Sequence, residues 1–199
     1  MRTGPEPPVL GVVLAGGASQ RMGRDKAALV LAGETLLARV VRLLRAALGG
    51  VVVVGPPERA ALVPGVRVVP DAAPGQGPLG AIATALDALN TPAIFVAACD
   101  MPFLRPALVA YLAGLAPGHD AVVPRTDHGT EQLCAVYGRG CLPAIAAQLA
   151  AGERAIAPLY ARVRTRFVAP EEWCAHDPDG ASFRNLNTPD DWRRAQSPP

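Results

Sequence analysis

The sequence predicts an α/β protein in which helices cover both faces of a doubly wound, mostly parallel sheet. Short apolar runs, partly β-branched and bounded by glycine, proline or aspartate, alternate with longer segments of helical periodicity. The runs are almost continuously apolar, which is typical of parallel strands buried on both faces. Alternation of such strands with helices favours a Rossmann-like arrangement.

Apolar runs mark the expected strands in the first half of the chain. We expect strands at residues 9–14, 51–54, 66–69 and 94–98. Leucine and valine recur at helical spacing in residues 35–48, with arginines on the opposite face, so an amphipathic helix is expected there. Residues 79–89 and 106–115 also have helical patterns.

The second half of the chain is less regular. We expect strands at residues 121–124, 133–137 and 164–168, and helices at 142–151 and 155–163. A closing helix should begin after Thr188, whose hydroxyl can cap it, with Pro189 at the first helical position. Residues 1–8 are expected to be a flexible tail and residues 9–195 a single domain, because 199 residues suffice for one α/β domain.

Composition excludes several classes of function. The chain holds 19 lysines and arginines against 17 acidic residues, a net charge of +2 that is too small to predict a nucleic-acid partner. No apolar run approaches the roughly 18 residues that a membrane span needs, so no membrane is expected. The four cysteines form no C-x-x-C pair and have no zinc-type spacing to histidine. A reducing, cytoplasmic location fits this pattern best.

The strongest functional motif is the glycine-rich segment LAGGASQRMGRDK at residues 14–26. A buried strand runs into Gly16 and Gly17, where the missing Cβ lets backbone N–H groups approach a phosphate or a base. Arg21 and Lys26 add positive charge that would neutralise a triphosphate and a departing pyrophosphate. The segment fits neither the P-loop nor the dinucleotide-binding pattern. The alternative is an ordinary strand-to-helix turn with solvated basic residues.

Two carboxylates and a second glycine-rich loop follow later strands. Ligands of open α/β sheets bind at the carboxyl ends of the strands, so these positions carry functional information. Asp100, in CDMP, is well placed to hold Mg²⁺ against phosphate oxygens, although a helix cap or turn residue is the alternative. Asp71 could be a second ligand, a sugar or base contact, or a turn residue. The loop GQGPLG at residues 75–80 opens a helix whose N-terminus attracts anions, which brings Gly80 into the predicted nucleotide site.

These segments resemble the molybdenum cofactor guanylyltransferases, a branch of the GT-A-like nucleotidyltransferases, and the resemblance covers almost the whole chain. Its landmarks are LAGGASQRMGRDKA (14–27), PDAAPGQGPLGAI (70–82), CDMPFL (99–104), QLCAVY (132–137), GERAIAPL (152–159) and FRNLNTPDDW (183–192). The last of them, of the form F-x-N-x-N-T-P, favours the branch that acts on molybdopterin.

The resemblance implies a reaction. Such enzymes use GTP and Mg²⁺ to join GMP to the terminal phosphate of molybdenum-carrying molybdopterin, and they release pyrophosphate. Because the attacking group is already an anionic phosphate, no general base is needed, and no histidine or cysteine is expected to be catalytic. Residues 9–104 would form the nucleotide-binding half and residues 105–195 the acceptor-binding half. Transient contact with other cofactor-synthesis proteins would deliver the acceptor.

The resemblance also implies roles for individual residues. The residues around the guanine nucleotide would be Leu14, Ala15, Gly16 and Gly17. Lys26 would bind the phosphates, Asp71 would contact the nucleotide, and Asp100 would bind both nucleotide and Mg²⁺. The acceptor side would include Asn185 and Asn187. Charge and position add Arg21 as a clamp on the β- and γ-phosphates.

Departures from the family pattern leave some nucleotide contacts open. No asparagine follows the strand at 51–54, and the segment GPLGA stands where the family has GPLAG, with Gly80 and Ala81 exchanged. The cytidylyl branch has LAAG where this chain has LAGG, so Gly16 favours guanine by leaving room near the base. The alternatives are a related transferase that uses CTP or another phosphorylated acceptor, and a non-catalytic nucleotide-binding module. Loss of Lys26 or Asp100 would favour such a module, and both are present.

Overall fold

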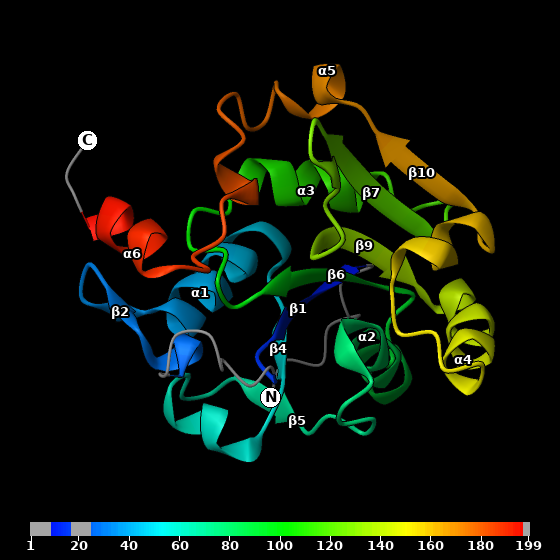
Figure 1. Cartoon of the computed structure of the whole chain (residues 1–199), viewed down its shortest axis with the longest axis horizontal. Helices are drawn as coiled ribbons and strands as arrows, with labels where there is room; N and C mark the ends of the chain where they lie inside the picture. The colour runs from blue at the N-terminus through cyan, green and yellow to red at the C-terminus, as the bar shows by residue number, and fades with distance from the viewer. Residues whose placement is uncertain (1–8, 17–24, 197–199) are drawn as a thin grey trace.

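The computed structural model describes residues 9–16 and 25–196, so the predicted tail at 1–8 lies outside the described residues. Most described strands join one eight-stranded sheet, in the order β10-β7-β9-β6-β1-β4-β5, with β8 paired to β7 (Figure 1). Its strands are β1 (Val9–Leu14), β4 (Val51–Val54), β5 (Arg67–Val69), β6 (Ala93–Ala98), β7 (Ala121–Thr126), β8 (Gly129–Thr130), β9 (Cys134–Gly138) and β10 (Thr165–Val168).

Strand directions confirm the mostly parallel sheet. β1 pairs in parallel with both of its neighbours, β4 and β6, and β4 pairs in parallel with β5. β9 runs antiparallel to both β6 and β7, whereas β10 is parallel to β7. Consequently β5, β4, β1, β6 and β7 all end at one edge of the sheet. That edge is where an open α/β sheet binds its ligands.

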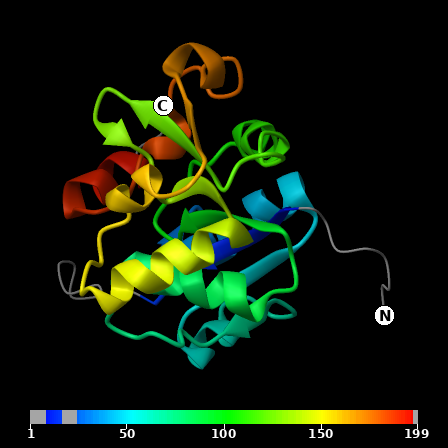
Figure 2. The same cartoon turned by 90° about the vertical axis from the view of Figure 1, so that its right-hand side faces the viewer.

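Helices cover both faces of the sheet, as the sequence predicts. Against one face pack α1 (Leu36–Leu48), α3 (Pro106–Gly114) and the short α5 (Pro170–Trp173), and against the other α2 (Gly77–Ala88) and α4 (Leu142–Ala150). Figure 2 shows α2 and α4 side by side over their face. No helix among the described residues is long and apolar enough to cross a membrane.

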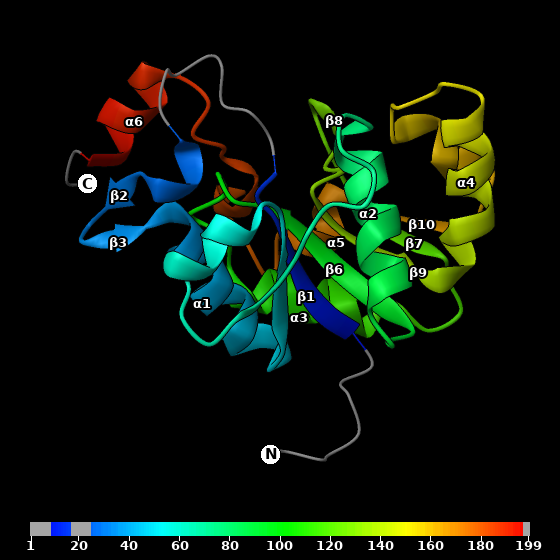
Figure 3. The same ribbon diagram turned by 90° about the horizontal axis from the view of Figure 1, so that it is seen from below.

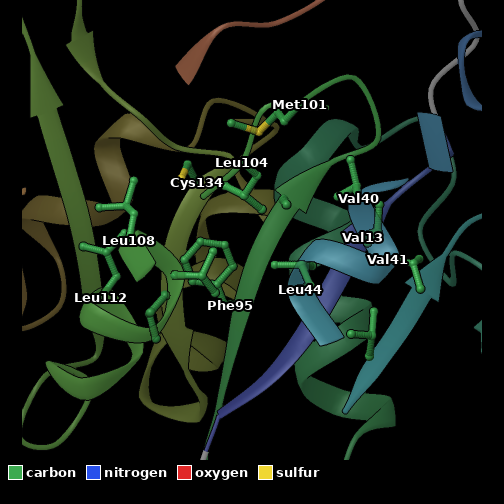
Figure 4. Close-up of a cluster of buried hydrophobic side chains, with 14 of the residues drawn as sticks. Val13, Val40, Val41, Leu44, Phe95, Met101, Leu104, Leu108, Leu112 and Cys134 are labelled. Atoms are coloured by element: carbon green, nitrogen blue, oxygen red, sulfur yellow. The ribbon is translucent and has the colours of Figure 1, made fainter. Parts of the chain in front are cut away.

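The hydrophobic core is divided by the sheet into two layers. Val13 on β1 joins the cluster on the α1–α3 side, where Figure 4 shows it near Val40 and Leu44, with Phe95 and Leu108 further along the same layer. Its neighbour on β1, Val12, points to the opposite cluster under α2 and α4. Both valines have no exposed surface. Two covered faces thus explain why the strands are continuously apolar.

The closing helix agrees with the prediction. α6 runs Pro189–Gln196 and lies beside a hairpin of β2 (Val30–Leu31) and β3 (Glu34–Thr35) (Figures 1 and 3). The Thr188 hydroxyl accepts a 3.1 Å hydrogen bond from the Asp191 N–H, which is the expected cap.

The predicted helix at 155–163 is wrong in its type and length. Only the 3-10 helix η4, Ala157–Ala161, forms there. The Arg162 N–H closes on the Leu159 carbonyl, three residues back, and the chain then enters β10. The remaining 3-10 helices of the described chain are η1 (Lys26–Ala28), η2 (Pro57–Ala61), η3 (Arg139–Cys141) and η5 (Ala181–Phe183).

Candidate nucleotide-binding site

The ends of the neighbouring strands are joined by backbone hydrogen bonds. The N–H of Ala15, just after β1, donates to the Val54 carbonyl at 2.8 Å. The N–H of Cys99, just after β6, donates to the Leu14 carbonyl at 3.2 Å. These bonds continue the hydrogen bonding of the sheet beyond the strands and hold the backbone at the carboxyl edge in place. The side chains that follow each strand therefore project from defined positions.

Three predicted site residues that are distant in sequence come together at this edge. The Lys26 ammonium donates a 3.0 Å hydrogen bond to Oδ2 of Asp100 and a 2.7 Å hydrogen bond to Oδ1 of Asn187. The Lys26 and Asp100 side chains are 15% and 16% exposed, so their ion pair is mostly shielded from water. Electrostatic interactions are stronger where water is excluded. A charged ligand at this site can therefore replace the contact between Lys26 and Asp100 with strong contacts of its own.

Local structure fixes each member of this cluster. Lys26 begins η1, which Asp25 caps by accepting a 3.1 Å hydrogen bond from the Ala27 N–H. Asp100 follows β6, and its carbonyl accepts a 3.0 Å hydrogen bond from the Leu186 N–H. That bond ties the segment before α6 to the loop of Asp100. Asn187, predicted for the acceptor side, consequently lies against Lys26.

A buried apolar cluster also holds the segment that precedes α6. Leu186 packs with Leu31 of β2 and Leu36 of α1, and Trp192 of α6 covers the group. Asn185, also predicted for the acceptor side, is exposed on the other side of Leu186. The C-terminal segment is thus held in place by packing as well as by hydrogen bonds.

Asp71 has different partners from Asp100. Its Oδ1 accepts hydrogen bonds from the Ala73 N–H at 3.0 Å and from the Thr84 hydroxyl at 3.1 Å. Thr84 in turn accepts a 3.2 Å hydrogen bond from the Ala72 N–H. One oxygen of Asp71 therefore fastens the loop after β5 to α2, and its second oxygen takes no part in those bonds.

Glycines near the site differ in what surrounds them. A Cβ on Gly55 would lie 3.0 Å from the backbone of Ala15, so the close approach of these two strand ends requires glycine there. A Cβ on Gly16 would meet only the Gly55 Cα, at an ordinary 3.8 Å. Gly16 is exposed, and packing within the described protein does not demand glycine at this position.

Gly80, predicted to bind nucleotide, lies buried in the first turns of α2. A Cβ there would approach Gln76 Cβ to 2.7 Å and the Ala73 carbonyl oxygen to 3.2 Å. Its missing side chain therefore lets the loop before α2 fold back onto the helix. Two other predicted residues, Gly17 and Arg21, lie outside the described residues.

Replacing Gly80 with alanine is expected to destabilise the protein by about 1–3 kcal/mol, because the new methyl group overpacks the turn. Chemical denaturation monitored by circular dichroism measures this change. Gly114→Ala is the matched control, since a Cβ on Gly114, at the end of α3, meets nothing within 4 Å. Equal stability of the Gly80→Ala and unaltered proteins would show that the turn is not tightly packed.

The Cys99 thiol at this edge lacks the properties of a nucleophile, and two of the three histidines have partners elsewhere in the fold. Burial, and then the charge of Asp100, raise the pKa of the Cys99 thiol to about 12, so it stays protonated near neutral pH. His119 bonds the Leu115 carbonyl, and His176 stacks on Tyr111 with ring centroids 4.1 Å apart. His128 is exposed in the β7–β8 turn.

Arg59 is a residue of this edge to which the sequence motifs assign no role. It follows β4 in η2, and its Nε donates a 3.0 Å hydrogen bond to the Ala15 carbonyl. The only available signal for Arg59 is an arginine soon after a strand, in GPPER, and arginines are frequent in this chain.

The sequence also carries a signal for Lys26, which is the only lysine in the sequence. Where all other basic residues are arginine, a single lysine at the strand edge indicates a need for a compact point charge.

A mostly parallel sheet with a lysine and an aspartate paired at its carboxyl edge suits a nucleotide-binding α/β enzyme, and the proteins similar to this chain identify the class as nucleotidyltransferase. The chain belongs to the MobA-like NTP transferase domain family, whose model matches residues 11–165.

Curated relatives extend this similarity over nearly the whole chain. The probable molybdenum cofactor guanylyltransferase of Pelotomaculum thermopropionicum is 39% identical over 186 residues, which cover 94% of this chain and 91% of the relative. The molybdenum cofactor guanylyltransferase of Rhodobacter capsulatus is 38% identical over 94% of this chain and 95% of its own length. The crystal structure of molybdopterin-guanine dinucleotide biosynthesis protein A from Archaeoglobus fulgidus superposes with a TM-score of 0.82, at 29% identity, over 94% of this chain and 96% of that chain.

Proposed function

We propose that this protein transfers GMP from GTP to the terminal phosphate of molybdenum-carrying molybdopterin and releases pyrophosphate. The observation that carries the proposal is the Lys26–Asp100 pair at the carboxyl edge of the sheet, in a chain whose relatives are guanylyltransferases. A cation and a carboxylate at one edge suit a triphosphate and the divalent ion that accompanies it.

The reaction balances without a protein nucleophile. An oxygen of the acceptor's terminal phosphate attacks the α-phosphorus of GTP, and the bond from that phosphorus to the bridging oxygen of the β-phosphate breaks. Negative charge then builds on the departing pyrophosphate, where the Lys26 ammonium neutralises it. Lys26 has to exchange its bond to Asp100 for phosphate oxygens, which frees the Asp100 carboxylate. The neutral thiol of Cys99 is consistent with a reaction that needs no thiolate.

The donor set at Asp100 fits a hard divalent cation, and we propose Mg²⁺. No group of three or more histidine, cysteine, aspartate or glutamate residues forms a metal site among residues 9–16 and 25–196. An ion held by Asp100 would therefore take further ligands from phosphate and water, as Mg²⁺ usually does at such sites. When bound, Mg²⁺ stabilises negative charge on the phosphates.

Other assigned roles stay predictions of the same proposal. Leu14, Ala15, Gly16 and Gly17 surround the guanine nucleotide, and Arg21 clamps its β- and γ-phosphates. Asp71 contacts the nucleotide through the oxygen not used in bonds to Ala73 and Thr84. Gly80 itself is buried. We therefore propose that the nucleotide contacts the backbone near Gly80.

The division of the chain into two halves is also proposed. Residues 9–104 bind the nucleotide and residues 105–195, including Asn185 and Asn187, bind the acceptor. The hydrogen bond between Asn187 and Lys26 supports a place for Asn187 at the junction, next to the phosphates of GTP. All four cysteines are free thiols, which suits a cytoplasmic reaction.

Gly16 supports GTP over CTP as the donor. Packing within the described residues does not require glycine at this position. We therefore propose that the guanine base is what leaves no room for a methyl group there. A transferase that uses CTP is the second candidate, because the Lys26–Asp100 pair suits either nucleotide.

Calorimetric titration with GTP, CTP, ATP and UTP, with and without Mg²⁺, tests the choice of donor. We expect GTP alone to bind well, and more tightly with Mg²⁺. A preference for CTP would assign the protein to cytidylyl transfer instead. Gly16→Ala should weaken GTP binding without loss of stability, and unchanged GTP affinity in that variant would contradict the role of Gly16. Binding of no nucleotide would overturn the proposal.

A further inference from the structure

One guanidinium joins two parts of the predicted nucleotide site. Arg59 is only 12% exposed, and its Nε donates to the Ala15 carbonyl at 3.0 Å. Its Nη1 donates to Oδ2 of Asp25. Ala15 directly follows β1 and is proposed to lie beside the base, whereas Asp25 directly precedes Lys26, which is proposed to bind the phosphates. Arg59 thus bridges the base side and the phosphate side of the site.

Asp25 extends this bridge into η1. While Oδ2 of Asp25 accepts from Arg59, its Oδ1 accepts a 3.1 Å hydrogen bond from the Ala27 N–H. Both oxygens of the carboxylate are therefore engaged, one by the guanidinium and one by the helix that begins with Lys26. The backbone that carries the Lys26 side chain is consequently fixed relative to Arg59.

The chemistry of the contact suits arginine. A planar guanidinium donates to a carbonyl and a carboxylate at once in fixed directions, which a lysine ammonium on a flexible stem does less well. Arg59 lies in η2, and its side chain reaches the end of β1 at Ala15. It comes from the segment after β4, which lacks the asparagine of the family pattern.

We propose that Arg59 is a positioning residue for guanylyl transfer: it holds Ala15 and Asp25 at the separation that lets one nucleotide reach both the base side and Lys26. This inference rests on the proposed function. It assigns to Arg59 no contact with the reacting atoms. Its loss should therefore affect how well GTP is held more than how fast bound GTP reacts.

Steady-state kinetics of Arg59→Ala test the inference. We expect KM for GTP to rise about tenfold, the change that corresponds to about 1.4 kcal/mol, while kcat falls less than about threefold and KM for the acceptor is unchanged. Arg59→Lys should recover part of the lost affinity. A residue needed only for stability would lower the melting temperature and the active fraction, and so kcat, without moving KM. That second pattern would overturn the inference.

A double-mutant cycle sharpens the test. Arg59→Ala and Asp25→Ala break the same link, so the double variant should bind GTP about as well as the weaker single variant. Independent, multiplicative losses would contradict the link. Should Arg59→Ala fold poorly, Asp25→Asn gives the same KM test, because the Asp25 side chain is 45% exposed and its loss disturbs packing less.

Arg164 is the matched control. It makes a forked pair with Asp120, with Nε to Oδ2 and Nη2 to Oδ1 both at 2.9 Å, just before β7 and so at the opposite edge of the sheet. Arg164→Ala should leave KM for GTP unchanged, and an equal rise there would overturn the inference. If the unaltered protein binds no GTP, the proposed function fails and the inference with it. If the unaltered protein binds GTP and Arg59→Ala binds it equally well, only the inference fails.

Discussion

Asp100→Asn is expected to reduce the rate of guanylyl transfer at least about a thousandfold, because a neutral amide cannot hold the divalent ion against the phosphates. The variant keeps the shape of the side chain and removes its charge. Single-turnover assays with saturating GTP, Mg²⁺ and acceptor measure the rate. The matched control is Asp87→Asn, which changes an exposed aspartate on α2 and should leave the rate unchanged.

Folding should survive the Asp100 substitution. Lys26 loses the charged partner that it contacts at 3.0 Å but keeps Asn187 at 2.7 Å, and the remaining charge on Lys26 retains some access to water. We expect the free energy of unfolding to fall by about 1–2 kcal/mol, which lowers the melting temperature by no more than about 8 °C. Normal turnover in a folded Asp100→Asn protein would show that the metal assignment is wrong.

Lys26→Met is expected to weaken GTP binding about tenfold to a hundredfold, since a charge-assisted contact to the phosphates contributes about 1.5–3 kcal/mol. GMP, which lacks the β- and γ-phosphates, should bind the variant almost as well as it binds the unaltered protein. Calorimetric titration with GTP, GDP and GMP separates the two effects. Equal losses for all three nucleotides would move Lys26 away from the terminal phosphates.

The single lysine of this chain allows a direct probe of the same contact. An amine-reactive reagent can modify only the Lys26 side chain and the N-terminus, and mass spectrometry distinguishes the two sites. GTP with Mg²⁺ should slow modification of Lys26 and leave the N-terminus as reactive as before. Protection by GMP to the same extent would contradict a contact with the terminal phosphates.

Much of the fold could be predicted because burial on both faces leaves a clear trace in the sequence. All four valines of the run VVVV at β4 are buried, and the amphipathic pattern of α1 matches the face that packs on the sheet. The β2–β3 hairpin was missed, since strands of two residues carry no periodicity. The sequence signal for its turn is the glycine at position 33. In the structure Gly33 has a φ of 81°, a conformation that glycine adopts readily.

The sequence indicates candidate site residues one by one, but it does not predict how they are arranged. Lys26 and Asp100 are each indicated by a glycine-rich loop or a strand end, yet their contact depends on β1 and β6 being neighbours in the sheet. Asn187 comes to Lys26 only because a buried leucine and a backbone bond hold the C-terminal segment against the Asp100 loop. Arg59 has only a weak local signal, its place soon after a strand, because its partners lie 44 and 34 residues away in the sequence.

A transfer assay with labelled GTP addresses the proposed reaction itself. The protein is incubated with molybdenum-carrying molybdopterin, Mg²⁺, and GTP labelled at either the α- or the γ-phosphate, and the products are separated. We expect the α-label in a pterin-containing dinucleotide and the γ-label in pyrophosphate, with both products lost in Asp100→Asn. Appearance of the γ-label on the pterin, or no transfer by a protein that binds GTP, would contradict guanylyl transfer.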